Sequence, residues 1–129
     1  MKKRCRILGN LGFTGKLVCS ISVRDHKESA EWYRDTLACE TVFAQEEMGM
    51  TYMSTPVGNV WLDISQVESP PVGGPALVWG VESVDRARAE IEGKGVRFDG
   101  PTREFGGMVK LATFFDPDGN TLMFYENLA

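Results

Sequence analysis

Hydrophobic and polar positions along this chain follow a period of two, then a period near 3.6, then a period of two again. The stretch from Lys16 to Val23 alternates in part and is rich in β-branched residues, which predicts a strand. Successive side chains of a strand point to opposite faces, so Val18 and Ser20 share one face of this strand.

A helix is expected next, over residues 27–37. Asp25 is the expected N-cap, and Glu28, three residues later, is its expected capping-box partner. The spacing i, i+3 and i+7 gives an apolar stripe that can lie on a sheet, formed by Ala30, Tyr33 and Leu37. Three more strands are expected, at 40–45, 50–55 and 60–65.

The pattern restarts after residues 68–75, where three prolines and two glycines exclude a regular element. Ser83 is the expected N-cap of a helix over residues 84–92, which Gly93 or Gly95 would end. The apolar stripe of this helix is Val84, Ala87 and Ile91. Strands are expected at 76–81, 96–98, 108–115 and 121–126.

The order strand, helix, three strands therefore occurs twice, at an offset of 58 residues. This predicts an α+β fold of two βαβββ modules, over about residues 16–65 and 76–126, with a linker at 66–75. Residues 1–15 show no clear periodicity and are expected to form an arm before a single domain over 16–129. One face of each sheet carries its helix. The other face needs a second module, a second chain or a ligand to cover it.

Two aromatic-rich strands flank a turn from Asp116 to Asn120. Pro117 presets φ for a type I turn and Gly119 tolerates positive φ, so a tight β-hairpin is expected. Asp116 and Asp118 are also metal-ligand types, but carboxylates in such turns usually cap backbone N–H groups, which favours a structural role.

Net charge and cysteine content limit the classes of partner and the cellular compartment that we expect for this protein. A chain of 129 residues with a net charge of −4 fits one globular domain and argues against nucleic acid or an anionic membrane as partner. No apolar run approaches the roughly 18 residues of a membrane span. The three cysteines, Cys5, Cys19 and Cys39, are odd in number and form no C-x-x-C pair, so we expect a reducing compartment, the cytoplasm.

Five segments carry a likeness to a known family: 23–25 (Val-Arg-Asp), 32–37 (Trp-Tyr-Arg-Asp-Thr-Leu), 81–85, 95–96 and above all 112–120 (Ala-Thr-Phe-Phe-Asp-Pro-Asp-Gly-Asn). From about Lys16 onward the chain resembles the vicinal oxygen chelate superfamily, which includes glyoxalase I, extradiol dioxygenases and bleomycin-resistance proteins. The resemblance implies two βαβββ modules that form a curved mixed sheet. It also implies a homodimer in which concave sheets of two chains form each pocket.

Enzymes of this superfamily hold a divalent metal with four side chains, from the first and last strands of each module. The resemblance places these positions at Val18, Asp63, Ala76 and Met123. Only Asp63 offers an oxygen ligand, because Val, Ala and Met side chains supply neither hard oxygen nor imidazole. The resemblance is therefore closest to the metal-free bleomycin-resistance-like branch, with no metal and no cofactor. The only histidine, His26, is expected in solvent at the start of the first helix.

Strand alternation groups the candidate binding residues by face, with Trp61 beside Asp63, Ser20 beside Val18, and Tyr125 beside Met123. The ligand-binding candidates are Ser20, Tyr52, Trp61, Asp63, Met123 and Tyr125. With Val18, Ala76 and Val78 they would line an apolar, aromatic-walled pocket, which Phe43 extends and residues 105–108 cover as a loop. The structural alternative is that the aromatic residues are core or dimer interface and that Asp63 pairs with a basic residue. Trp79 has the opposite parity and is expected in the core.

Three functions remain open at this point. The first is a metal-free protein that sequesters a small molecule, apolar or aromatic and able to carry positive charge, such as an antibiotic or toxic compound. The second is a metal-dependent lyase or dioxygenase with displaced ligands, for which Glu46, Glu47 and Glu126 are available. The third is a metal-free enzyme with Asp63 as general base. No Ser-His-Asp, Cys-His, P-loop or dinucleotide pattern selects a reaction.

Overall fold

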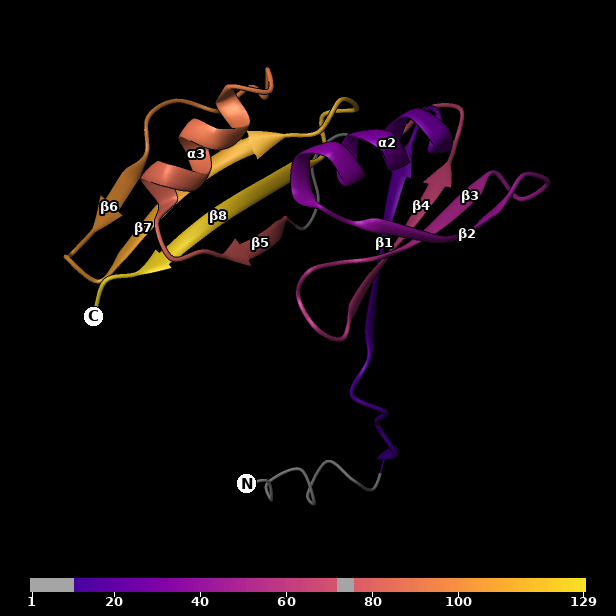
Figure 1. Ribbon diagram of the computed structural model, residues 1–129, viewed down its shortest axis with the longest axis horizontal. Coiled ribbons are helices and arrows are strands. Elements are labelled where there is room, and N and C mark those ends of the chain that lie inside the picture. Colours follow the sequence, from indigo (N-terminus) through magenta and orange to yellow (C-terminus); the bar gives the residue numbers. More distant parts are fainter. Residues whose placement is uncertain (1–10, 72–75) are drawn as a thin grey trace.

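A computed structural model describes residues 11–71 and 76–129, and it contains two modules, each a helix on a four-stranded sheet (Figure 1). Module 1 consists of β1 (Leu17–Val23), α2 (His26–Leu37), β2 (Glu40–Gln45), β3 (Met50–Ser54) and β4 (Val60–Gln66). Module 2 consists of β5 (Leu77–Gly80), α3 (Val84–Glu92), β6 (Arg103–Phe105), β7 (Val109–Phe115) and β8 (Thr121–Asn127).

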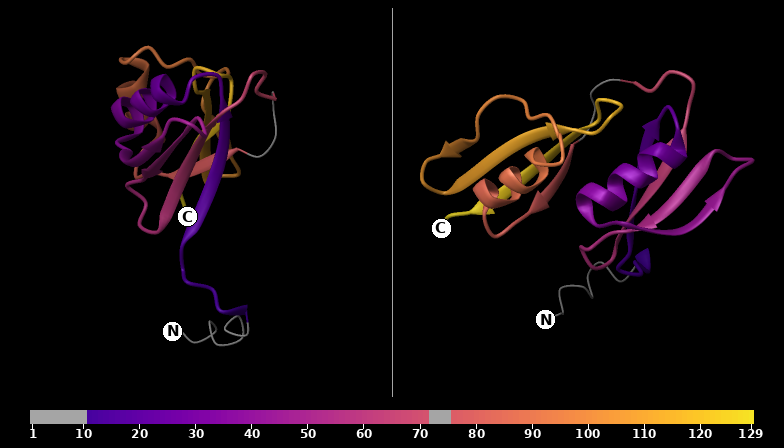
Figure 2. Two further views of the ribbon diagram at one scale, coloured as in Figure 1. Left: turned by 90° about the vertical axis from the view of Figure 1, so that its right-hand side faces the viewer. Right: turned by 45° about the horizontal axis from the view of Figure 1, so that its top comes forward.

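Both sheets have the same topology, which confirms the predicted α+β fold. The strand orders are β1-β4-β3-β2, here called sheet A, and β5-β8-β7-β6, here called sheet B. The pairs β1–β4 and β5–β8 are parallel and the other pairs are antiparallel, so both sheets are mixed. The right-hand view of Figure 2 looks onto the helices and shows both in front of their sheets, so the opposite, helix-free faces also point to one side.

The helices begin at the residues that the sequence indicates. The side chain of Asp25 accepts hydrogen bonds from the backbone N–H groups of Lys27 and Glu28 at 3.0 and 3.1 Å, and Ser83 caps α3 in the same way. Only half of the expected capping box forms, because no bond from the Glu28 side chain is present among the described residues. Neither helix in the described part of the chain is long and apolar enough to span a membrane.

The hydrophobic core lies between each helix and its sheet and runs on from one module to the other. In module 1 it contains the buried side chains of Ile21, Val23, Tyr33, Leu62 and Ile64. In module 2 it contains Val84, Ile91, Phe114, Leu122 and Phe124, with Trp79 packed against the cluster as predicted. Because strand side chains alternate, burial of this set turns the residues between them toward the helix-free faces.

The β7–β8 hairpin joins the two modules through its turn. The Asp116 carboxylate accepts hydrogen bonds from the backbone N–H groups of Asp118 and Asn120, at 2.9 and 2.8 Å, which confirms the predicted turn-capping role. It also accepts a hydrogen bond from the Tyr33 hydroxyl in α2 at 2.8 Å. Burial beside this carboxylate raises the pKa of Tyr33 well above its usual value.

Asp118 adds further contacts to this joint, by which we mean the hydrogen bonds between the β7–β8 turn and module 1. Its carboxylate accepts the backbone N–H of Arg24 at 3.0 Å, the guanidinium of Arg24 at 3.2 Å and the hydroxyl of Ser29 at 3.2 Å. Asn120 donates its side-chain amide to the Ser22 carbonyl at 3.1 Å. The residues that resembled a metal-binding loop thus make contacts between module 2 and module 1.

Two expectations about local structure need correction. No strand forms at 96–98, where Phe98 makes a single bridge to Phe114, and the strand beside β7 is instead β6, Arg103–Phe105. Phe105 therefore belongs to a strand rather than to a covering loop, and Gly106 and Gly107 make the turn into β7 at φ values of 57° and 67°. The expected arm and linker fall in part on residues 1–10 and 72–75, which lie outside the described residues.

Candidate functional site

Four of the predicted binding residues come together on the helix-free face of sheet A. In the register of β1 and β4, Ser20 lies opposite Asp63 and Val18 lies opposite Trp61. In the register of β3 and β4, Tyr52 lies opposite Asp63. Cross-strand partners are close enough for their side chains to touch, so the face presents two aromatic rings around one carboxylate and one hydroxyl.

Three aromatic rings form a row across this face, from β2 to β4. The ring centroids of Phe43 and Tyr52 are 5.4 Å apart. Those of Tyr52 and Trp61 are 5.6 Å apart with an interplanar angle of 2°, a stacked arrangement. Phe43 is 48% exposed, so the row stays open to solvent at its β2 end. A row of aromatic rings this wide offers an apolar contact area against which a planar molecule can pack.

Asp63 accepts hydrogen bonds from two serine hydroxyls and has no cationic partner in the described part of the chain. The bond from Ser65 measures 2.8 Å and the longer one from Ser20 measures 3.4 Å. No Lys or Arg nitrogen among residues 11–71 and 76–129 lies within ion-pair distance of this carboxylate. An ionised carboxylate has about four lone-pair sites, so Asp63 keeps acceptor capacity for a ligand.

Within the described residues, one cation lies on the aromatic row. The ammonium nitrogen of Lys16, the residue before β1, lies 4.3 Å from the Trp61 ring centroid and 5.6 Å from that of Tyr52. The indole Nε1 of Trp61 is buried and has no hydrogen-bond partner among the described residues. Sequence reasoning missed Lys16 and Ser65, although both share the strand parity of residues that it did select.

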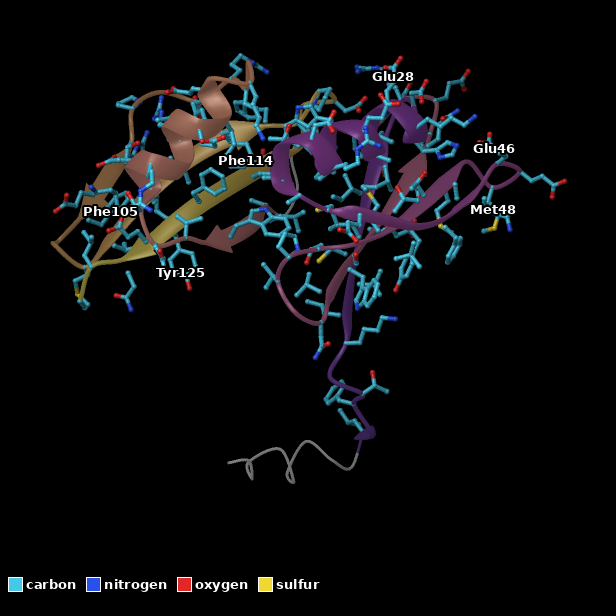
Figure 3. All side chains as sticks on the ribbon, viewed as in Figure 1. Glu28, Glu46, Met48, Phe105, Phe114 and Tyr125 are labelled. Carbon is cyan, nitrogen blue, oxygen red and sulfur yellow. The ribbon has the colours of Figure 1, made fainter. Side chains whose placement is uncertain are left out.

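The other two predicted residues, Met123 and Tyr125, lie on the helix-free face of sheet B. Met123 pairs with Val78 of β5 and Thr113 of β7. It lines a cavity of about 150 Å³ together with Arg103, Phe105 and Thr113. Figure 3 shows Tyr125 pointing away from α3, on the opposite side of the sheet from Phe114.

Tyr125 also lies against the backbone of β5. A Cβ atom added to Gly80 would come within 3.1 Å of the Tyr125 ring, so the absence of a side chain there makes room for it. The predicted pocket residues are therefore divided between two sheets, four on sheet A and two on sheet B. Strand alternation assigned each residue to its face, but it contained no information on the distance between the sheets.

His26 is not where the sequence suggested. Its side chain is buried, with 4% of the residue exposed, and its Nδ1 lies 2.7 Å from the Thr51 hydroxyl. Its backbone N–H donates to the Gln66 side chain at 3.0 Å. His26 therefore faces β3 and β4 from the first turn of α2 and holds the helix start to the sheet. The expectation that it would be in solvent was wrong, because a helix N-terminus that packs on a sheet turns its first residues inward.

The four positions at which the superfamily's enzymes hold a metal do not fit a divalent cation in this chain. Val18 and Asp63 lie on sheet A, and Met123 lies on sheet B with Ala76 just before β5. Of these only Asp63 has a suitable donor. No group of three or more His, Cys, Asp or Glu side chains with metal-binding proximity occurs within residues 11–71 and 76–129.

A second cavity, of about 340 Å³, lies between the modules and was not anticipated. Cys19 and Ser20 of the β1 edge line it from one side, and Leu77 and Thr121 line it from the other.

The two thiols in the described part of the chain, Cys19 and Cys39, are free. Cys39 is fully buried, and burial raises its pKa to about 12, so its thiol stays protonated and unreactive at neutral pH.

Comparison with solved structures supports the fold. A superfamily member from Sphaerobacter thermophilus has a TM-score of 0.75 and 21% identity, covering 89% of this chain and 98% of its own. TnmS3, an antibiotic-binding protein from Streptomyces sp. CB03234, has a TM-score of 0.75 and 22% identity, covering 90% and 98%. The fosfomycin resistance protein FosX from Listeria monocytogenes has a TM-score of 0.74 and 15% identity, covering 89% and 94%.

No curated protein matches the chain in sequence. The sequence family is nevertheless shown, because the Glyoxalase/Bleomycin resistance protein/Dioxygenase superfamily matches residues 16–124, most of the chain. Both βαβββ modules fall within that range. The chain therefore belongs to the Glyoxalase/Bleomycin resistance protein/Dioxygenase superfamily.

Proposed function

We propose that this protein binds and sequesters a small planar molecule that stacks on the aromatic row of sheet A. The observation that carries the proposal is the row of Phe43, Tyr52 and Trp61 on the face of sheet A opposite α2, next to a carboxylate that has no cationic partner among the described residues. Such a face joins a large apolar contact area to one orienting polar group, which is the usual composition of a small-molecule site.

Magnitudes indicate which contacts would matter. An aromatic pair contributes about 0.5–1.5 kcal/mol beyond its buried area. A hydrogen bond to a charged group contributes about 1.5–3 kcal/mol. A ligand with a planar ring and a cationic or N–H donor would use both, through Trp61 and through Asp63. The ligand class that fits this face is therefore an aromatic molecule that carries a hydrogen-bond donor.

Sequestration is favoured over conversion by the donor chemistry at the family's metal positions. Three of the four residues there, Val18, Ala76 and Met123, have no donor for a divalent ion. Two structural neighbours are described as an antibiotic-binding protein and a fosfomycin resistance protein, which makes an antibiotic or another toxic compound the first ligand class to test. Stoichiometric Zn, Ni, Fe or Mn in purified protein would instead favour a lyase or dioxygenase.

The binding experiment uses a thermal-shift screen of planar aromatic cations and neutral aromatic antibiotics, followed by titration calorimetry of the hits. A hit should raise the Tm of the wild-type protein and bind at least about tenfold more weakly to Asp63→Asn, since the charged acceptor is lost. Glu31→Gln, an exposed carboxylate on α2, is the matched control and should leave affinity unchanged. Hits that bind Asp63→Asn and wild type equally, or no hit at all, would overturn the proposed site.

We also propose that the protein is a homodimer in the cytoplasm. The helix-free faces expose large apolar side chains, among them Val18 at 47%, Phe43 at 48% and Val78 at 51%. A second copy would cover these and could bring the sheet B residues Met123 and Tyr125 against the aromatic row of sheet A. Light scattering coupled to gel filtration should give twice the mass of 14.3 kDa, and Val78→Lys should shift the protein toward monomer. A monomer at all concentrations would contradict this.

A further inference from the structure

The ammonium group of Lys16 lies on the aromatic row and has no role in the proposed function. Lys16 Nζ lies 4.3 Å from the Trp61 centroid and 5.6 Å from the Tyr52 centroid, so it is within cation–π distance of both rings. It makes no ion pair with an acidic group among the described residues. Its interaction with the protein is therefore with the π-faces, the surface on which the proposed ligand would stack.

We propose that Lys16 is a specificity-determining residue of this face, whose ammonium occupies the cation position on Trp61 and Tyr52 and selects against cationic ligands that would replace it. The inference rests on the proposed function, because it concerns the same aromatic row. A cation over an aromatic ring is held by the ring quadrupole, and two cations on the same ring face repel each other. A cationic ligand must displace Lys16, whereas a neutral planar ligand can stack with Lys16 still beside it.

The position of Lys16 in the chain allows this displacement. It lies directly before β1, in a described stretch of 11–16 that contains no strand, and its side chain is exposed. Leu11 and Phe13 in the same stretch are 74% and 68% exposed, so little packing holds the segment down. Moving the ammonium away from the rings therefore breaks a cation–π contact without disturbing the core.

Asp63 makes the selection graded rather than absolute. Its carboxylate lies on the same face, opposite Tyr52, and has no basic partner in the described part of the chain. A cationic ligand that displaces Lys16 would gain Asp63 as a counter-charge. Displacing Lys16 then costs a cationic ligand free energy that its contact with Asp63 must exceed. Neutral aromatic molecules do not have this cost, because they leave Lys16 in place.

The test uses a matched pair of probes, N-methylacridinium and neutral acridine, at a mildly alkaline pH where acridine is uncharged. The quantity is the ratio of the two Kd values, measured for the full-length protein by titration. Lys16→Met keeps most of the length of the side chain but removes its charge, and should shift the ratio toward the cation by about two- to five-fold, the scale of an exposed cation–π contact. Lys16→Arg should restore the wild-type ratio. Arg86→Gln removes an exposed cation from α3 and is the control.

A second readout follows the displacement directly. In wild-type protein, the methylene protons of Lys16 next to Nζ should resonate upfield because of the two rings, and N-methylacridinium should return them toward their free position. Acridine should leave them shifted. If the probes bind but the Kd ratio is the same in Lys16→Met and wild type, or if Lys16→Met binds the cation more weakly, the inference on Lys16 fails and the binding function stands. If neither probe nor any screened compound binds, both fail.

Discussion

Burial assigns different roles to individual residues of module 1. Asp63 and Trp61 occupy the same face of β4 and stay partly exposed. Cys39, directly before β2, has no exposed surface. A carboxylate on an open face can meet a ligand, whereas a thiol within the core is shielded from solvent, and desolvation raises the pKa of this thiol to about 12.

The first prediction concerns Cys39. In the native protein Cys39 should not react with a thiol reagent, so Cys39→Ala should show as many reactive thiols as the wild type when folded and one fewer after unfolding in guanidinium. The folded-state pKa lies above the unfolded value near 9, so stability is retained below pH 9 and lost as the pH rises toward about 12. Cys39→Ala should flatten that alkaline loss in chemical denaturation. Equal alkaline slopes in both proteins would contradict it.

At the scale of elements, the sequence was sufficient wherever a strong local signal coincided with the tertiary arrangement. The helix starts at Asp25 and Ser83, the strand faces and the β7–β8 hairpin all follow from residue type and spacing. It failed at residues 96–98, where three residues of strand-like composition find only one bridge. Pairing with β7 comes instead from residues 103–105, which have no clear alternation, so strand identity there is set by the partner and not by local propensity.

The second prediction tests the half-formed capping box. Asp25→Ala should lower the free energy of unfolding by about 1 kcal/mol, because two backbone N–H groups of α2 lose their acceptor. Glu28→Ala is the matched variant and should change it by less than about 0.5 kcal/mol, since Glu28 makes no reciprocal bond among the described residues. Urea denaturation of both variants decides. A loss for Glu28→Ala as large as that for Asp25→Ala would mean that the full box forms in solution.

At the scale of the whole molecule, the joint between the modules could not be predicted. The sequence indicated that Asp116 caps backbone N–H groups of a turn, and it does. It contained no sign that the same turn receives Tyr33, 83 residues away, because periodicity describes faces within an element and not contacts between modules. For the same reason the six candidate binding residues could be assigned to faces but not to one cavity.

The third prediction concerns that joint. Tyr33→Phe should lower the free energy of unfolding by about 1.5–3 kcal/mol, since the buried Asp116 carboxylate loses a hydroxyl donor. Tyr125→Phe is the control: its hydroxyl makes no hydrogen bond within the described residues, and its loss should cost less than about 0.5 kcal/mol. Hydrogen exchange should show faster opening at the β7–β8 turn in Tyr33→Phe only. Unchanged exchange there would mean that other contacts hold the modules together.

The joint also sets an order of events during synthesis. Arg24 and Ser29 meet Asp118 across 94 and 89 residues, so module 1 leaves the ribosome long before its partners in the turn exist. Until then the Tyr33 hydroxyl has no carboxylate to bond, and the first module must persist with an open side. Docking of the last hairpin is the step that ends this exposure. Its speed decides how long a half-made chain presents an apolar flank to chaperones or to other nascent copies.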